Sequence, residues 1–294
     1  MRNLERRYRA LLRVLPKWYR QDREEEMVGL FLVERTDELD LEHSWPGWGE
    51  TFAMLGLAVR THLAAGSGMT QAPAKAVWRG EVVRALGMIG LLLGVFYAGG
   101  AITSMAFAYN HPEIVNALTW LRVFDFAPVV AFVALLAGKR TLAKVAALAA
   151  VMPAFVSLAD LQHILSWLAF QVPSIVTFVA LCLGFHREAP TPPVRRLAWW
   201  GGGALLFGLA GGFALGAGPL AVVLVTFIVR VVAFVRGDVV LGRALSLFAV
   251  PQLVPLVWLV GSEVHGIVVG LLAVLVITIV APVRRPSAQK FRVS

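Results

Sequence analysis

The feature that most constrains this chain is a succession of long apolar segments, which begins at Val82 and continues nearly to the C-terminus. Each segment approaches the roughly 20 residues that an α-helix needs to cross the hydrocarbon core of a bilayer. Of the 294 residues, 58% are hydrophobic and 15% are charged, so the chain has more apolar surface than one soluble core needs. The sequence therefore predicts an all-α, polytopic transmembrane helix bundle with about eight spans, near residues 83–108, 118–138, 142–160, 167–185, 197–216, 219–236, 243–261 and 264–283.

The charges in the connections predict the topology. Lys and Arg are missing from the connections "YNHPEIVNAL", "DLQHIL", "GAGP" and "GSEVHG", whereas the alternate ones, "GKRTLAK", "HREAPTPPVRR", "VRGDVVLGR" and the tail "RRPSAQKFRVS", are basic. By the positive-inside rule both termini are cytoplasmic and the protein lies in the plasma membrane. This rule also explains the net charge of +9 better than a nucleic-acid surface does. Short connections after Pro219 leave six or seven crossings as alternatives.

The first 66 residues differ from the rest because they are rich in charge. Residues 4–15 place apolar side chains at helical spacing, and Pro16 ends that helix. Asp22 is a plausible N-cap for a second helix, and a third helix is expected to bury the stripe Trp48, Phe52, Leu55, Val59 and Leu63. We therefore expect a small cytoplasmic three-helix domain at residues 1–66, a linker at 67–77, the transmembrane bundle at 78–284 and a basic cytoplasmic tail at 285–294.

Charge within the first domain is divided between two stretches. Residues 1–20 are basic and residues 22–42 are mostly acidic, so the domain lacks the one-sided basic surface of a nucleic-acid-binding protein. One interpretation is a self-complementary helical bundle. The other is a docking module for anionic lipid or a partner protein. Its candidate docking residues are Arg6, Arg9, Arg13, Tyr19, Arg20, Glu25 and Glu26.

The pattern "RRYRALLRVLPKWYRQDREEEM" within this domain resembles a known family. A basic Leu-rich helix, Leu-Pro, Tyr-Arg and Glu-Glu-Met are similar to the cytoplasmic prefix of many actinobacterial membrane proteins, the HAAS family of helical signalling domains and the prefix domain of some permeases. The resemblance covers about the first 65 residues. The resemblance implies a signalling or regulatory role, because HAAS-like domains are typically encoded beside PadR-type transcription regulators. It implies no catalytic residues. The alternative that it implies is a permease, or the membrane subunit of an ABC-type transporter with a separate ATPase subunit.

Motifs for catalysis are missing from the sequence. There is no phosphate-binding loop, no Gly-x-Ser-x-Gly elbow and no His-Glu-x-x-His helix, so we expect no enzyme activity and no cofactor. Three predicted outer connections each pair a histidine with a carboxylate, which permits metal binding or pH sensing. The other interpretation is that loops without Lys and Arg contain these residues by default. The pairs are His111 with Glu113, Asp160 with His163, and Glu263 with His265.

Small and charged residues within the spans predict helix contacts. Glycines at four-residue spacing allow close approach of helices in lipid. Gly208, Gly212 and Gly216 therefore serve either packing within the bundle or a homo-oligomer.

Intramembrane charges usually find partners. Asp125 and Arg230 are expected to pair across the bundle, with Arg122 reaching the outer interface or competing locally for Asp125. Together these features predict a non-enzymatic membrane protein that relays an envelope or membrane cue to a cytoplasmic partner.

Overall fold

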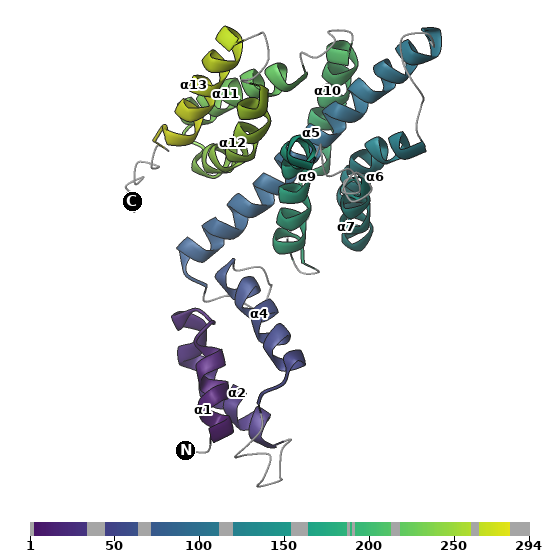
Figure 1. Ribbon diagram of the computed structural model, residues 1–294. Coiled ribbons are helices and arrows are strands. Elements are labelled where there is room, and N and C mark those ends of the chain that lie inside the picture. Colours follow the sequence, from purple (N-terminus) through teal and green to yellow (C-terminus); the bar gives the residue numbers. More distant parts are fainter. Residues whose placement is uncertain are drawn as a thin grey trace. The chain divides into compact units, whose positions relative to one another are not determined.

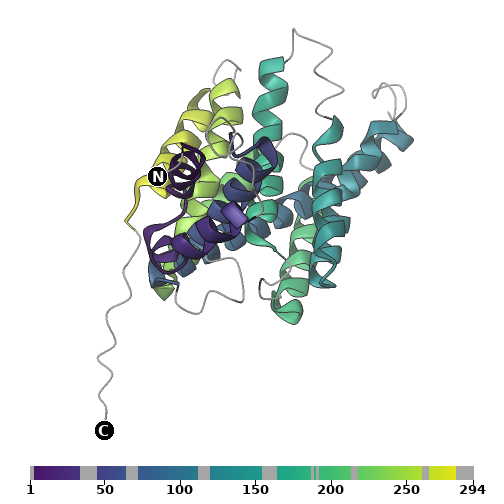
Figure 2. The same ribbon diagram turned by 90° about the horizontal axis from the view of Figure 1, so that it is seen from below.

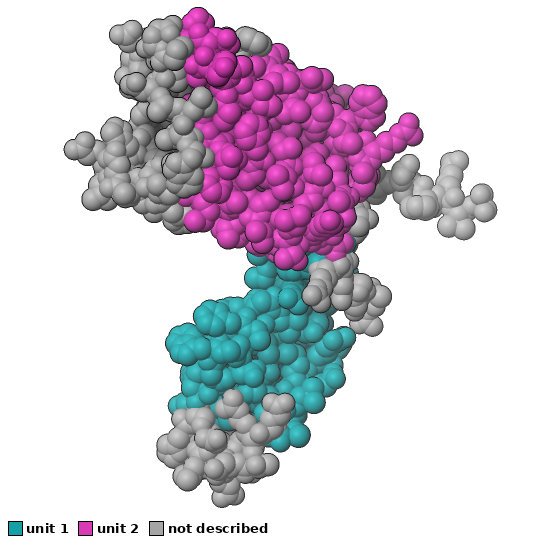
Figure 3. All heavy atoms as spheres, turned by 90° about the vertical axis from the view of Figure 1, so that its right-hand side faces the viewer, with its two compact units in different colours: residues 1–81, 183–189 teal, residues 82–182, 190–294 magenta. Residues whose placement is uncertain are grey.

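A computed structural model describes residues 3–33, 45–63, 72–111, 120–153, 164–186, 189, 192–212, 218–259 and 265–282. Every regular element among these residues is a helix, which confirms the predicted all-α class (Figure 1). The chain forms two compact units: unit 1 contains residues 1–81 and 183–189, and unit 2 contains residues 82–182 and 190–294 (Figure 3). The boundary therefore falls inside a helix, beyond the predicted linker.

The helices of unit 1 are α1 (Asn3–Leu12), α2 (Lys17–Val33) and α4 (Trp48–His62), followed by the start of α5 (Ala74–Asn110). The remaining elements are η1 (Trp120–Phe126, a 3₁₀ helix), α6 (Ala127–Leu136), α7 (Arg140–Ala149), α9 (Ile164–Gly184), α10 (Val194–Gly212), α11 (Gly218–Arg236), α12 (Val239–Leu259) and α13 (His265–Val280).

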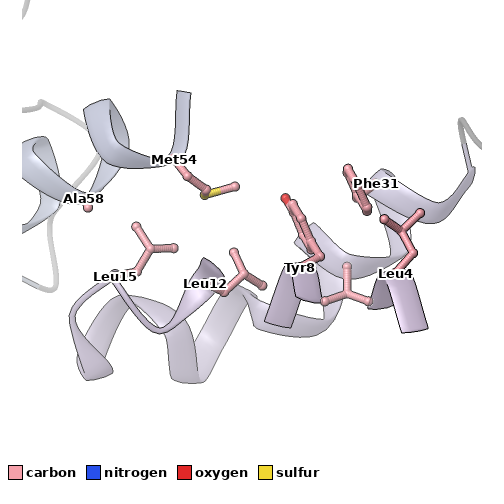
Figure 4. Packing of buried hydrophobic residues seen from close by; sticks show 8 residues of the cluster. Leu4, Tyr8, Leu12, Leu15, Phe31, Met54 and Ala58 are labelled. Atoms are coloured by element: carbon pink, nitrogen blue, oxygen red, sulfur yellow. The ribbon is translucent and has the colours of Figure 1, made fainter. Parts of the chain in front are cut away.

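A continuous apolar core holds α1, α2 and α4 of unit 1 together (Figure 4). The predicted apolar positions of the first helix supply its centre, and the rings of Tyr8 and Phe31 stack with centroids 3.9 Å apart. The buried members are Leu4, Tyr8, Leu12, Leu15, Val28, Phe31, Met54 and Ala58. Apolar burial of this kind is the main stabilising force in a small helical unit. Unit 1 therefore has a core of its own.

The second helix begins earlier than the sequence suggested. It starts at Lys17, directly after Pro16, so Asp22 lies inside the helix and is not its N-cap. The backbone amides of Tyr19 and Arg20 donate to the Pro16 carbonyl oxygen at 3.0 and 3.1 Å. Proline has the fixed φ and the missing N–H that suit the start of a helix, so Pro16 initiates α2 as well as ending the preceding segment.

The predicted buried face of α4 was wrong. Trp48, Phe52, Leu55 and Val59 are 75%, 66%, 42% and 37% exposed. The face that packs on the core is instead formed by Met54, Ala58 and Thr61. Because α4 has apolar residues on both faces, helical periodicity alone does not select which face meets α1.

Unit 2 contains two helical hairpins with the same turn. The turn after α6 places Gly138 at φ 74°, and the turn after α11 places Gly237 at φ 71°. In each, the following amide donates back to the helix: Lys139 N to Ala134 O at 2.8 Å, and Asp238 N to Ala233 O at 2.9 Å. This is the Schellman arrangement, which favours glycine because the left-handed conformation strains other residues. Both turns occupy predicted cytoplasmic connections.

Packing in unit 2 follows these hairpins. Helix α6 packs on α7, and α11, α12 and α13 pack on one another, with α10 beside α6 and α11. The yellow-green helices α12 and α13 lie side by side in both ribbon views (Figures 1 and 2). A core cluster among the last three helices contains Val223, Ala249, Leu256, Leu271 and Leu275.

The helix α5 is long and apolar enough to cross a membrane, and it is the one helix among the described residues that meets both conditions. Its 37 residues extend about 55 Å at 1.5 Å per residue. The stretches Gln171–Gly184, Val239–Val254 and Gly266–Val280 are apolar but shorter. Most predicted spans coincide with helices, but the segment predicted at 118–138 is η1 followed by α6, because Pro128 lies at the start of α6. The segment predicted at 142–160 is described only to residue 153, with α7 ending at Ala149.

Candidate functional site

A cavity of about 650 Å³ lies within unit 2. One face of α5 forms a wall, with Gly90, Gly94, Tyr97, Ala101 and Ser104 at three- and four-residue spacing. The other walls come from η1, α6, α7, α9, α11 and α12. Most lining groups are apolar, and a few polar side chains interrupt them, which is the usual composition of a small-molecule site.

Two glycines of α5 shape the cavity wall by allowing neighbours to approach. A Cβ atom on Gly90 would collide with the side chain of Thr177 in α9, and one on Gly94 would collide with the ring of Pro128 in α6. Thr177 in turn donates its hydroxyl to the Pro173 carbonyl oxygen at 2.7 Å. These two glycines, four residues apart, therefore let α6 and α9 pack closely against the cavity wall.

The charged residues of η1 line the same cavity. Arg122 donates from Nη1 to the Ser104 hydroxyl oxygen of α5 at 3.0 Å, and Asp125 is exposed. A guanidinium beside a hydroxyl can bind a carboxylate, a phosphate or a polar head group. The hydrogen bond of Arg122 therefore goes to α5, while its charge also acts on the nearby Asp125 carboxyl group, so the predicted local interaction with Asp125 stays a prediction.

The buried amide of Gln252 on α12 also lines the cavity. Its side chain is 4% exposed, and its Nε2 donates to Thr226 Oγ1 at 3.2 Å and to the Phe248 carbonyl oxygen at 3.4 Å. Its Oε1 is buried and accepts no hydrogen bond in the structure. Burying a polar atom without a partner costs about 1–3 kcal/mol. This oxygen is therefore an acceptor ready for a hydrogen-bond donor on a ligand.

The predicted pair between Arg230 and Asp125 is wrong. Arg230 is 3% exposed and donates from Nε to Ser246 Oγ at 3.2 Å, and from Nη2 to the carbonyl oxygens of Ala281 at 2.9 Å and Pro282 at 3.3 Å. The carbonyls at the end of a helix lack partners within the helix. The long Arg230 stem therefore reaches the C-terminal end of α13 instead of Asp125, and this contact joins α11, α12 and α13.

Gly208 packs against another helix of the same chain, α5. A Cβ atom on this residue would collide with the backbone carbonyl of Phe96, and one on Gly99 would collide with the backbone of α10. The face of Gly208 is thus occupied by α5 and is not free for a homo-oligomer contact. Gly212 ends α10, and Gly216 lies outside the described residues.

The histidine and carboxylate pairs fall mostly outside the described residues. Glu113, Asp160, His163 and Glu263 are not described, and of His265 only the backbone is. His111 follows α5, with its ring centroid 4.6 Å from that of Phe107. Among the residues that the structure describes, no three potential metal ligands lie together. The metal or pH-sensing site remains a prediction.

Several charged side chains of α1 and α2 in unit 1 pair with one another. Arg9 of α1 holds Glu25 of α2 with two hydrogen bonds, of 2.6 and 2.9 Å, and its Nε donates to Glu5 at 3.0 Å. Arg20 lies 3.5 Å from Glu24. The hydrogen bonds from Arg9 hold the pKa of the Glu25 carboxyl below its ordinary value. These contacts match the self-complementary bundle, so Arg9, Arg20 and Glu25 are occupied.

The other proposed docking residues are arranged differently. Arg6 donates to the Asn3 side chain at 3.1 Å, and Tyr19 packs partly against the core with its hydroxyl 3.4 Å from Arg23. Arg13 and Glu26 are exposed, and the ion pairs found among the described residues do not include them. Arg13 and Glu26 are thus the members of the set that a partner can reach.

Gln252, Ser104 and Ser246 were not predicted as site residues. Each is an uncharged polar residue in an apolar stretch of its helix, and such residues need partners when they are buried. Uncharged polar residues inside the spans were the signal that could have identified the site. No family model, no curated protein and no solved structure matches this chain.

Proposed function

We propose that this chain is a multi-pass membrane protein with a signalling role. In this proposal a membrane or envelope cue binds the cavity of unit 2, and unit 1 relays the change to a cytoplasmic partner. The observation that carries the proposal is the unsatisfied acceptor Gln252 Oε1 in a cavity that also contains Arg122 and Ser104. A ligand that donates a hydrogen bond to this buried oxygen stabilises the bound protein. The ligand-bound and ligand-free states of the protein therefore differ in free energy.

Helix α5 supports the relay physically. Residues 74–81 of this helix belong to unit 1, and its later residues, including Gly90, Tyr97 and Ser104, line the cavity. The residues of α5 thus provide a covalent connection between the cavity and unit 1. The resemblance of the first 65 residues to HAAS-like signalling domains supports the same role, with a cytoplasmic regulator protein as the partner.

A permease, or the membrane subunit of an ABC-type transporter, is the second candidate. It is favoured by Pro173, which lies inside α9 and lines the cavity. A proline within a membrane helix removes a backbone hydrogen bond and creates a bending point. Helices interrupted at a midplane binding site are typical of transporters. Stoichiometric co-purification of a nucleotide-binding subunit would favour this function over the relay.

The membrane topology is tested by cysteine labelling of the full chain. The single native Cys182 is replaced by serine. Cysteines are then introduced separately at Asn110, the last residue of α5, and at Thr141, in the first turn of α7 and within the basic segment that begins it. Both positions are exposed. We expect an impermeant maleimide added outside cells to label Asn110→Cys and not Thr141→Cys, because the basic connection is cytoplasmic. Both positions should label after the membrane is permeabilised. Labelling of both in intact cells would contradict the topology.

The relay is tested with a photo-cross-linking amino acid at the exposed Glu26 of the full chain, in native membranes. We expect a cytoplasmic protein to cross-link to this position. In Gln252→Leu the cross-linking yield should change by about fivefold or more, since about fivefold is the lower end of typical allosteric coupling. Val250→Leu, on the exposed face of the same helix, is the matched control and should leave the yield unchanged. An equal yield in wild type and Gln252→Leu under every growth condition would refute the coupling.

A further inference from the structure

An apolar surface covers the outer side of α4 in unit 1. We name it the outer face of α4, formed by Trp48, Phe52, Leu55 and Val59. Successive members are three or four residues apart, so they share one side of the helix. The rings of Trp48 and Phe52 lie 6.1 Å apart. Trp45, just before the helix, is also exposed. Because the opposite side of α4 already packs on the core, this apolar surface is left open to an occupant other than the core of unit 1.

The charges around the outer face of α4 indicate what that occupant is. Arg60 and His62 are exposed near the C-terminal end of the helix. At 100° per residue, His62 lies about 40° and Arg60 about 120° from Trp48, so both flank the surface. The one acidic residue of α4, Glu50, lies about 160° away, toward Tyr8 in the core. The pKa of the Tyr8 hydroxyl is raised mainly by burial and to a lesser extent by the charge of Glu50. Basic residues beside exposed tryptophans are typical of helices that bind an anionic membrane interface.

The length of the chain between α4 and α5 adds an independent constraint. Ten residues, 64–73, separate Leu63 from Ala74, where α5 begins. Ten extended residues span at most about 35 Å. The C-terminal end of α4 is thus tethered within that distance of a helix with the length and hydropathy of a membrane span. Lys75 and Arg79 are exposed in the first turns of α5, so positive charge also follows the ten-residue connection.

We propose that the outer face of α4 lies on the cytoplasmic leaflet and inserts Trp48 and Phe52 at the depth of the lipid head groups. Anionic lipids strengthen this contact through Arg60 and the cations at the start of α5. The proposal rests on the membrane location in the proposed function, but not on the cavity or on a protein partner. Unit 1 is then a peripheral lipid-binding domain as well as a relay.

The test uses the full chain with Cys182 replaced by serine, reconstituted in lipid nanodiscs. A spin label is attached to Leu55→Cys, or to Glu26→Cys as a water-exposed control on α2. Collisions with oxygen, which concentrates in lipid, are compared with collisions with a water-soluble nickel chelate. The discs contain phosphatidylcholine alone or phosphatidylcholine with phosphatidylglycerol. We expect the label at residue 55 to favour oxygen, more so in the anionic discs, and the label at residue 26 to favour nickel in both.

A second variant tests whether the apolar face itself makes the contact. Phe52→Glu should return the residue 55 label to nickel accessibility, because a carboxylate on this face repels anionic lipid and prevents insertion. Ala53→Glu is the matched control, since it adds the same charge on an exposed position about 100° away. Phe52 is 66% exposed and is not a member of the core cluster, so the replacement leaves the core of unit 1 intact.

Each other result overturns the proposal. If the nickel chelate reaches the label at residue 55 in both kinds of disc, the outer face of α4 lies in water. A label shielded from both reagents shows a face covered by protein, either unit 2, a second copy or a partner. An unchanged label in Phe52→Glu shows that the face does not make the contact. A chain that fails to enter the discs refutes the membrane location itself, and so separates failure of the proposed function from failure of lipid docking.

Discussion

Replacing Gly208 by alanine is expected to lower the free energy of unfolding by about 3 kcal/mol, the upper range for overpacking a tight contact. The added Cβ atom would collide with the backbone carbonyl of Phe96, and a backbone atom moves only if the whole helix moves. Helices α5 and α10 must therefore separate, which weakens the contact between Phe96 and Phe207, whose rings lie 5.6 Å apart. In lipid, such close packing is a principal source of helix association. The measurement is the folded fraction of detergent-purified protein after heating, followed by gel filtration.

Gly203→Ala is the control for this prediction because it lies on the same helix with no atom within 4 Å of the added Cβ position. There the substitution should be neutral or stabilise the protein by up to about 1 kcal/mol, because alanine has the higher helix propensity. Gly99→Ala, on the α5 side of the same crossing, should destabilise as Gly208→Ala does. If Gly208→Ala and Gly203→Ala have the same stability, α5 and α10 do not cross at Gly208.

Removing the guanidinium of Arg230 has the second largest expected effect. In Arg230→Met, the Ala281 and Pro282 carbonyls at the end of α13 lose their donor, and Ser246 loses a hydrogen bond. Hydrogen bonds to a charged group contribute about 1.5–3 kcal/mol, so we expect a loss of about 3 kcal/mol. Arg230→Lys should lose less, since one ammonium can still reach a single acceptor. Thermal unfolding in detergent measures both variants.

Arg236→Met is the matched control, because Arg236 lies at the exposed end of the same helix and substitutions at such sites usually change stability by less than about 0.5 kcal/mol. Asp125→Asn provides a second comparison, since the structure does not pair Asp125 with Arg230. It should leave the effect of Arg230→Met unchanged in the double variant. If Arg230→Met is as stable as the wild type, the arginine only extends toward the membrane interface and does not stabilise the packing of α13.

The candidate site was predictable only in part, and for physical reasons. Arg122 was recognisable because a charge inside an apolar segment needs a partner, but the sequence did not reveal that the partner is Ser104, eighteen residues earlier. Gln252 carries no charge, so the rule that identified Arg122 did not apply to it. Its importance depends on burial and on an unmet hydrogen bond, and both are properties of the packed structure.

The sequence by itself determined where helices form. Apolar periodicity and basic connections located the helices from α9 onward to within a few residues, because these signals act within one or two turns of the chain. The starts of α2 and α5 were placed too late and the end of α7 was placed too far along the chain. The tertiary structure alone decided which faces meet: Met54 instead of Phe52 in the core, and the end of α13 instead of Asp125 beside Arg230. Helices that are apolar on several sides have several faces that can pack, and long side chains have several partners within reach. Only the geometry of close packing across the whole fold selects among them.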